Sequence, residues 1–458
     1  MIKKNELCIA FSTLSKYQTE FWLKIADEIT QDNNCEVCFF SFDQRSSKII
    51  SKTRHKYFCF SKYSKKKYNP DNIFQYPLKS KEGSILHEQI VFNESDLTKL
   101  EQKYVNAINF CEDGIAEICE IFSEIHLFQE VGGFISVNAL FEVAKINGVN
   151  CWFLESSFFQ GRVFAHKNTQ SFTKINYPFP SKKSLTSAEN HLNNILKNKT
   201  LVIPIKDKYF YNSSISKLLN FHKIKRFFEK SYDKYVLGYY QDFGHPFNQA
   251  TSALKMFLSS VFQFLFYAPI SNHTKLIYFP LHVPTDMSLT IRNPEYVDQI
   301  ALVKRIVNNL PKDYKLIIKE HPAMVGAIGF FKLLNLILRT KDVIFVNPKS
   351  NNYDVASIAE LVITVNSKSG AEALILGKNV AVLGDAFYSN SKLVIKLDSP
   401  EKISHTIKNL HKNRSPNAFT DTQDFFAAVW QSTYKGELYD KDNLNVKSLS
   451  ASLLKIVK

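Results

Sequence analysis

The clearest candidate for chemistry in the sequence is a short polar motif that directly follows an apolar run. Residues 314–319 end in Lys319-Glu320-His321-Pro322. A proline fixes its own φ and turns the chain out of a strand. At the carboxyl edge of a parallel sheet, where anionic ligands bind, the Lys319 and His321 side chains would be available to a phosphate. We expect Lys319, His321 and Pro322 to form part of such a site, and a strand-ending turn with a surface histidine is the alternative.

A second motif has the composition of a metal-free phosphate cradle. Residues 366–370 read Asn-Ser-Lys-Ser-Gly, follow an apolar run and open a stretch with helical spacing. Hydroxyl groups and the free N–H groups of a helix N-terminus bind phosphate without a metal. Glu372, in the first turn, could accept hydrogen bonds from a ribose. An ordinary N-cap is the alternative, and it is compatible with phosphate binding. We expect the phosphate to lie against Ser367, Ser369 and Gly370.

A third polar segment carries a histidine, an aspartate and a serine. His282, Asp286 and Ser288 lie in a loop after the apolar run 276–279. A carboxylate at the mouth of a cleft can act as a nucleophile or as a base. The pattern by itself favours a turn or a helix N-cap for Asp286.

Two further acidic positions come from the first half of the chain. Glu155 ends the apolar run 152–154, so we expect burial to raise its pKa and to suit it to general acid catalysis. An exposed loop glutamate is an equally good interpretation. Glu112 and Asp113 fall within helical spacing, which favours a helix surface over a site.

Strand-like and helix-like runs alternate in both halves and would position these side chains. This order is typical of parallel sheets with crossover helices. We predict an α/β fold with two Rossmann-like, doubly wound domains that face a central cleft, as in the GT-B class of glycosyltransferases. The expected strands are 7–11, 36–42, 125–128, 150–154, 276–279, 314–319, 343–346, 361–365 and 380–383. The expected helices are 17–29, 136–146, 294–309, 353–359 and 370–376.

The composition of the chain suggests three regions. The likeness to the GT-B class implies an N-terminal, acceptor-side domain at 1–190 and a C-terminal, nucleotide-sugar domain at 271–458. Between them, 191–270 is a basic and aromatic interdomain segment that ends in an apolar helix at 253–267. This helix either packs between the domains or contacts a membrane interface.

The net charge and the cysteine content indicate which binding partners and metal ions the protein could have. With 58 Lys+Arg and 43 Asp+Glu among 458 residues, the net charge is +15. Nine of the basic residues lie in the tract 45–67, for which we weigh a solvated loop first, an anionic membrane surface second and nucleic acid last. Cys35 and Cys38 form a C-x-x-C pair in an apolar run, which favours buried strand cysteines over a metal site. No nucleic-acid motif accompanies the charge, so no nucleic-acid partner is expected.

Taken together, the motifs resemble the bacterial capsule polysaccharide biosynthesis proteins, a family that includes the retaining β-Kdo glycosyltransferases. The resemblance is best over residues 276–390. It is carried by 278–288, by Lys319–Pro322, and by 367–374 with the glycines that follow it. In the first half, Leu154–Phe158 resembles the family's acidic strand-end motif.

This resemblance implies a GT-B fold and a CMP-Kdo donor, with no metal and no bound cofactor. It implies Asp286 as the nucleophile and Glu155 as its acid/base partner. It places Glu372 near the ribose. The phosphate would contact Lys319, His321, Ser367 and Ser369. His282 stands where commoner members have Gln, and Glu-Ser-Ser replaces Glu-Asp-Gly at Glu155. Both departures leave the exact ulosonic acid open.

Two other functions remain as alternatives. An inverting, sialyltransferase-like enzyme would use Asp113 as its base, and a non-catalytic capsule-assembly protein would release no CMP. For the main interpretation we expect a surface-polysaccharide or glycolipid acceptor. The basic segments and the absence of an 18-residue apolar run suggest a cytoplasmic protein loosely bound to the inner face of the membrane.

Overall fold

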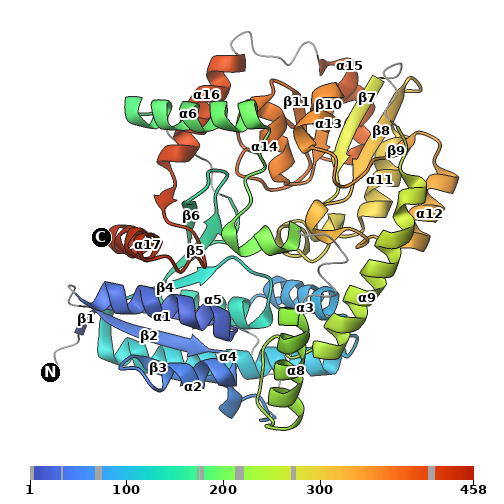
Figure 1. Ribbon diagram of the computed structural model, residues 1–458. Coiled ribbons are helices and arrows are strands. Elements are labelled where there is room, and N and C mark those ends of the chain that lie inside the picture. Colours follow the sequence, from blue (N-terminus) through green and yellow to red (C-terminus); the bar gives the residue numbers. More distant parts are fainter. Residues whose placement is uncertain are drawn as a thin grey trace.

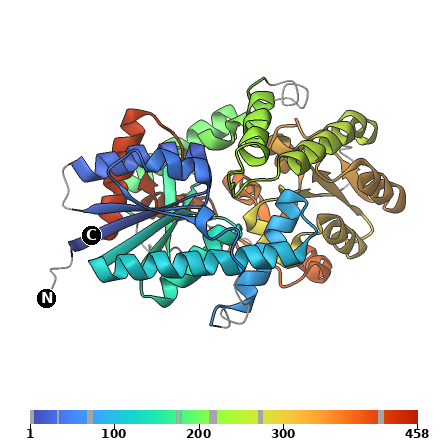
Figure 2. The ribbon, with the colours of Figure 1, turned by 90° about the horizontal axis from the view of Figure 1, so that it is seen from below.

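Two β-sheets, each flanked by helices, form the two halves of the molecule (Figure 1). The computed structural model describes residues 5–31, 35–67, 75–172, 175, 180–211, 221–269, 275–410 and 418–458. Seen from below, the two halves lie side by side (Figure 2). The predicted division into two α/β domains is confirmed.

The first sheet has seven strands in the order β13-β6-β5-β4-β1-β2-β3. The strands from β1 to β5 pair in parallel, whereas β6 is antiparallel to both of its neighbours, β5 and β13. Their bounds are β1 Asn5–Thr13, β2 Glu36–Ser41, β3 Lys56–Cys59, β4 Phe122–Glu130, β5 Asn150–Ser156, β6 Arg162–Lys167 and β13 Tyr434–Lys435. The helices are α1 Lys16–Gln31, α2 Gln44–Ile50, α3 Leu78–Phe92, α4 Leu97–Ile121 and α5 Ile135–Ile146. Because helices cover both faces, the central strands are almost continuously apolar.

The second sheet has six parallel strands in the order β12-β11-β10-β7-β8-β9. They are β7 Lys275–Pro280, β8 Tyr314–Lys319, β9 Val343–Phe345, β10 Leu361–Thr364, β11 Asn379–Val382 and β12 Ile395–Lys396. The helices include α10 Met287–Thr290, α11 Gln299–Asn308, α12 Phe330–Arg339, α13 Asn352–Ile358, α14 Lys368–Ile375 and α15 Ile403–Lys408. The 3₁₀ turns are η5 Pro294–Tyr296, η6 Pro322–Met324 and η7 Pro400–Lys402. The strand order reverses between β7 and β10, and such a switch point opens a ligand crevice at the carboxyl ends of the strands.

Two local expectations differ from the structure. The helix expected at 294–309 is interrupted, because the side chain of Asp298 accepts a hydrogen bond from the Ala301 N–H at 3.0 Å and starts α11. The basic tract 45–67 is not a loop. It contains α2, the edge strand β3 and the turn η1 (Phe60–Lys62), because its aromatic residues pack inward on the core.

Both cysteines of the C-x-x-C pair are free thiols, but Cys35 lies just before β2 and is only partly buried, so the expectation of buried strand cysteines holds for Cys38 alone. Cys38 is buried, and its sulfur lies 3.5 Å from that of Cys8 on the neighbouring strand. Over the residues that the structure describes, no group of three metal-ligating side chains occurs. None of the helices in these residues has the length and apolar content needed to cross a bilayer.

The chain ends in the first half, not in the second as the boundary 271–458 would have it. After α16 (Ala418–Gln431) the chain adds β13 to the first sheet and packs α17 (Asn443–Val457) on α1 (Figure 1). Leu449 and Leu453 of α17 are fully buried in the same cluster as Trp22. The physical reason is that α1 has an apolar face that needs a cover on the outside of the sheet.

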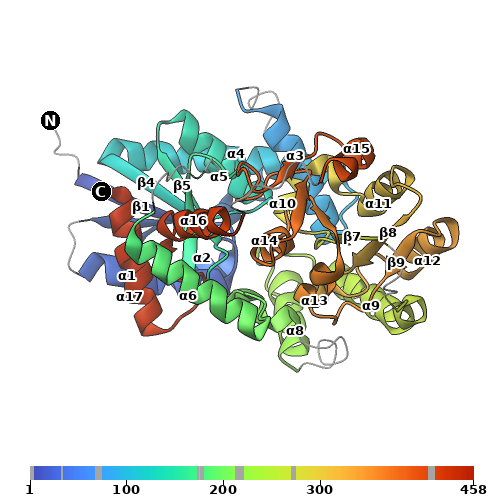
Figure 3. The same cartoon turned by 90° about the horizontal axis from the view of Figure 1, so that it is seen from above.

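The interdomain segment 191–270 is also more structured than a single insertion. It comprises the end of α6 (Lys182–Asn198), η3 (Ile205–Tyr211), α8 (Phe221–Tyr235), α9 (Pro246–Phe262) and η4 (Gln263–Phe266). Helix α6 lies along α16, and α9 runs from the first half towards α12 in the second (Figure 3). The segment therefore links the two halves along one edge of the cleft.

Candidate active site

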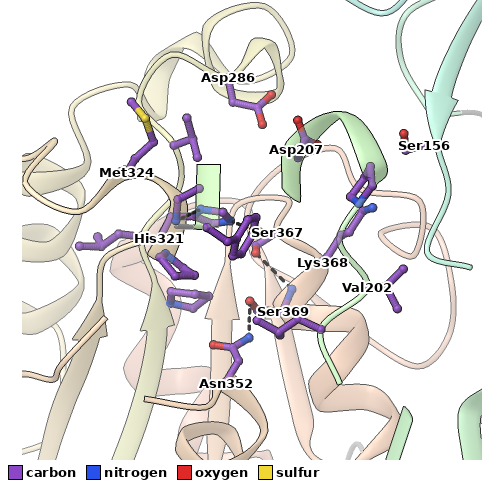
Figure 4. A pocket seen from close by; sticks show the side chains of 18 of the residues that line it. Ser156, Val202, Asp207, Asp286, His321, Met324, Asn352, Ser367, Lys368 and Ser369 are labelled. Atoms are coloured by element: carbon purple, nitrogen blue, oxygen red, sulfur yellow. Dashed lines mark hydrogen bonds between the residues drawn. The ribbon is translucent and has the colours of Figure 1, made fainter. Parts of the chain in front are cut away.

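A cavity of about 470 Å³ lies between the two domains, a size typical of small-molecule sites. The first domain contributes the ends of β4 and β5, and the second contributes the ends of β7, β8 and β10. The turn η3 supplies a further part of the wall. The cavity therefore lies at the switch point of the second sheet and faces the carboxyl ends of strands in the first (Figure 4).

The N-terminus of α14 forms one wall of the cavity. Ser367 is the N-cap, and its hydroxyl accepts a hydrogen bond from the Ser369 N–H at 3.1 Å. The Ser369 hydroxyl accepts one from the Asn352 amide at 2.7 Å. Both serines and Lys368 line the cavity. The positive end of the helix and two hydroxyls thus lie in one wall, an arrangement suited to an anion, and the Lys368 ammonium group beside them donates to the Ser157 carbonyl at 3.0 Å.

The motif after β8 lies on the adjacent wall, as expected. Lys319 is almost fully buried, and its ammonium group donates to the Ser350 carbonyl at 3.3 Å. Burial lowers the Lys319 pKa to about 8, although Glu372 partly opposes this shift. The His321 ring nitrogen Nε2 lies 3.4 Å from the Tyr211 hydroxyl. Pro322 begins η6 and also lines the cavity.

Glu372 is held inside the cavity wall by Asn352. The Asn352 amide donates to the Glu372 carboxylate, and its carbonyl oxygen accepts from the Tyr278 hydroxyl at 2.5 Å. Burial raises the pKa of Glu372, while the Asn352 hydrogen bond and Lys319 act in the opposite direction. Glu372 can thus serve as a hydrogen-bond partner for a hydroxyl-rich ligand.

Asp286 lies across the cavity from α14. It is the N-cap of α10, and its side chain accepts a hydrogen bond from the Ser288 N–H at 2.9 Å. The structure therefore confirms the cap suggested by the sequence pattern. The residue is also exposed and lines the cavity, with its carboxylate directed into it (Figure 4). Asp286 can cap the helix and face the cavity at the same time, because one carboxylate oxygen accepts the Ser288 N–H and the other is left for the cavity.

Glu155 lines the cavity, but the expected rise of its pKa is wrong. Burial by itself would raise the pKa, yet Arg292 and His166 outweigh it and hold the pKa well below its usual range. Arg292 binds both carboxylate oxygens, at 3.1 and 2.6 Å. The sequence could not reveal this partner because it lies 137 residues away on the other domain.

Besides Asn352 and Lys368, the cavity wall includes four charged or hydroxyl-bearing side chains that were not assigned from the sequence. Three of them, Lys206, Asp207 and Tyr211, belong to η3, and the fourth is Glu130 at the end of β4. Lys206 forms an ion pair with Glu130, which raises the Lys206 pKa despite its burial. Burial raises the Asp207 pKa. No periodic pattern marks these residues, so only the tertiary structure could identify them.

Four residues singled out from the sequence do not line the cavity. The buried His282 makes backbone hydrogen bonds to Gln299, and the Ser288 carbonyl accepts from Asn366. Gly370 is needed for packing, because a Cβ there would lie 2.2 Å from the Tyr388 hydroxyl. Asp113 lies on α4, as its helical spacing predicted, and accepts a hydrogen bond from Tyr63 at 2.6 Å.

The chain is similar to a protein family and to a curated protein. Residues 210–423 match the family described as capsule polysaccharide biosynthesis protein. A 132-residue stretch is 31% identical to Protein FixF of Sinorhizobium fredii (strain NBRC 101917 / NGR234), covering 28% of this chain and 31% of that protein. The chain thus matches about a third of the length of this curated relative.

Two solved structures are similar at low identity. The beta Kdo 2,7 transferase of Thermosulfurimonas dismutans KpsC has 16% identity and a TM-score of 0.35, over 82% of this chain and 96% of that one. The beta Kdo 2,4 transferase of the same KpsC has 12% identity and a TM-score of 0.37, over 68% and 81%.

Two doubly wound domains with one cleft between their carboxyl edges define a protein of the GT-B-like fold. Residues 210–423, which include the anion-binding wall, are similar to the capsule polysaccharide biosynthesis protein family.

Proposed function

We propose that this protein is a glycosyltransferase that moves Kdo, or a related ulosonic acid, from a CMP-sugar to a surface-polysaccharide or glycolipid acceptor. The observation that carries the proposal is the meeting of Asp286 with the α14 anion site across one cavity. A nucleotide-sugar needs both a phosphate cradle and a group that reacts at the anomeric carbon. The family match and the named activity of the similar KpsC domains support the same class of reaction.

In this proposal the second domain holds the leaving group. Ser367, Ser369 and the N–H groups of α14 bind the CMP phosphate, and Lys368 adds a positive charge beside them. His321 and Lys319 approach the same phosphate from the end of β8, and Glu372 accepts hydrogen bonds from the ribose. Stabilising the charge that develops on a departing phosphate lowers the barrier to its departure.

The transfer itself uses two displacements in the proposed mechanism. An Asp286 oxygen attacks the anomeric carbon as the bond from that carbon to the phosphate oxygen breaks, and CMP leaves with the bonding pair. The acceptor hydroxyl then attacks the same carbon and releases the carboxylate, which gives net retention. The acceptor hydroxyl loses its proton in this second step, so a base must face the nucleophile.

For this base we propose Asp207 in place of Glu155. Glu155 is bound by Arg292 through both of its oxygens, so its carboxylate is occupied as an anchor between the domains. Asp207 lines the same cavity as Asp286, and burial makes its carboxylate more basic. Its neighbour Lys206 lines the same cavity and forms an ion pair with Glu130 there.

The proposal is tested by intact-mass spectrometry of the protein after incubation with CMP-Kdo and no acceptor. Wild-type protein should gain the mass of one ulosonic acid residue and release an equal amount of CMP. Asp286→Asn should form no adduct, since an amide does not attack the anomeric carbon, and should bind CMP as the wild type does. Asp207→Asn should form the adduct and lose it more slowly.

Asp113→Asn is the matched control, since it changes an acidic residue outside the cavity. It should behave as the wild type. An adduct that still forms on Asp286→Asn would remove this residue from the mechanism, whereas loss of activity in Asp113→Asn would favour the inverting alternative.

A further inference from the structure

One edge of the molecule exposes an unusual amount of apolar surface. Most of the exposed large apolar side chains of the described residues lie on α8, α9, η4 and α12 and in the turn after α8. These helices lie next to one another on the side of the molecule where α9 joins its two halves (Figure 3). Contiguous apolar surface of this kind marks an interaction site.

On α9 most of the exposed large apolar side chains form a single stripe. They recur at helical spacing and continue into η4, while Ser259 and Gln263 on the opposite side are buried. The stripe consists of Phe247, Leu254, Leu258, Val261 and Leu265. Each of the three leucines is at least half exposed, so nothing in the described structure covers them.

The neighbouring helices extend this stripe on both sides. On α8 the exposed side chains are Ile224, Phe228, Tyr232 and Tyr235. Rings of α8 pack against Phe247, with a centroid distance of 5.7 Å to Tyr235. On the other side, α12 exposes Phe331 by 81% and Leu338 by 74%. We refer to these exposed side chains of α8, α9, η4 and α12 as the α8–α9–α12 surface.

The charges on the same helices are almost all positive. Exposed cations occur on α8, α9 and α12, and they are Lys225, Arg226, Lys255, Lys332 and Arg339. The sequences of α9 and α12 contain no acidic residue. On α8, Asp233 is buried and Glu229 approaches Arg45 at 4.0 Å. An apolar stripe flanked by cations and rich in aromatic rings is complementary to anionic lipid headgroups and the acyl region beneath them.

We propose that the α8–α9–α12 surface docks this protein peripherally on an anionic bilayer. The apolar stripe of α9 enters the interface, and the cations of α8, α9 and α12 meet the lipid phosphates. A second copy of the chain would bring these cations against each other, which disfavours self-association. This inference goes beyond the proposed transfer reaction and does not depend on it.

Vesicle co-sedimentation of the purified full chain tests this docking. The probes are vesicles of phosphatidylethanolamine with phosphatidylglycerol, and vesicles of phosphatidylcholine alone. Wild-type protein should pellet with the anionic vesicles, and 1 M salt should weaken this binding because the Debye length falls to about 3 Å. The double variant Leu254→Gln with Leu258→Gln should bind at least about tenfold more weakly, because two of the five exposed large apolar side chains of α9 become polar.

Leu97→Gln with Leu444→Gln is the matched control, since these leucines are exposed by 52% and 77% on the first domain. It should pellet as the wild type does. The same result is expected when Lys65, Lys66 and Lys67, which follow η1, are changed to Gln. Unchanged binding of the α9 variant, or wild-type protein that ignores anionic vesicles, would overturn the proposal. Light scattering that shows a dimer lost in the α9 variant would assign the surface to a second copy instead.

Discussion

Buried charges define this site at the scale of single residues. Lys319 and Glu372 are buried and Lys368 is partly buried around one cavity, so their protonation depends on burial and on neighbouring charges. His321, Ser367 and Ser369 could be predicted because each follows an apolar strand run within a few residues. The properties of Glu155 could not, because its pKa is set by Arg292 from the other domain. Lys206 and Asp207 escaped prediction because η3 follows no repeating pattern.

The lowered pKa of Lys319 leads to a pH-dependent affinity for CMP. As the pH rises through about 8, free Lys319 loses its proton, whereas a bound phosphate favours the charged form. Affinity should therefore fall by up to about tenfold per pH unit above 8. Calorimetric titrations of CMP between pH 6.5 and 9.5 measure this dependence.

Lys319→Arg serves as the control for this titration. Arginine stays charged throughout the range, so the decrease attributed to Lys319 should vanish in the variant. An equally steep decrease in both proteins would show that another group causes it.

At the scale of elements, the order of the strands brings the polar motifs together. The second sheet reverses its order between β7 and β10, so the loop with Asp286 and the helix α14 lie on either side of one crevice. Apolar runs were sufficient to predict these strands, because strands buried on both faces are continuously apolar. The α2–β3 segment was mistaken for a loop. Phe58 and Phe60 both pack on the core, but the many lysines around them hide this alternating apolar pattern in the sequence.

Helix α14 should depend on the glycine in its first turn. A Cβ at position 370 would lie 2.2 Å from the hydroxyl of the buried Tyr388, which donates to the Ser367 carbonyl. Gly370→Ala should therefore lower the free energy of unfolding by about 1–3 kcal/mol and weaken CMP binding. Thermal unfolding and calorimetry measure the two effects.

Gly83→Ala is the matched control within helix α3. The nearest atom to a Cβ at that position is 3.5 Å away, which is an ordinary contact. This variant should be neutral or slightly stabilising, because alanine favours a helix over glycine. If both alanine variants leave stability and binding unchanged, the packing of Tyr388 does not position α14.

At the scale of the whole molecule, the C-terminal end of the chain returns from the second domain to the first. Strand β13 and helix α17 complete the first domain although they follow the second in sequence. Strand β13 is short and helix α17 has an ordinary amphipathic pattern, and neither feature indicates which sheet the element joins. The sequence analysis therefore assigned both elements to the domain that precedes them in the chain. Across the cleft, Arg292 with Glu155 and Lys368 with the Ser157 carbonyl link the domains directly.

Weakening α17 should destabilise the first domain. Leu449→Ala removes a fully buried side chain from the cluster that contains Trp22, so it should cost about 2–5 kcal/mol. Urea unfolding followed by tryptophan fluorescence measures the loss. Leu444→Ala, on the same helix but 77% exposed, should have little effect. Equal stability of the two variants would mean that α17 is not part of the first domain.

The central claim is that the cleft binds the CMP part of a sugar donor at the ends of β8 and β10. Calorimetric titration of CMP into the wild type, His321→Ala and Ser369→Ala, with UDP as the comparison ligand, tests it most directly. The account predicts that the wild type binds CMP more tightly than UDP. It also predicts that His321→Ala loses at least about tenfold in CMP affinity and Ser369→Ala somewhat less, because each removes a partner of the phosphate. Unchanged CMP affinity in both variants, or a wild type that binds UDP and not CMP, would contradict it.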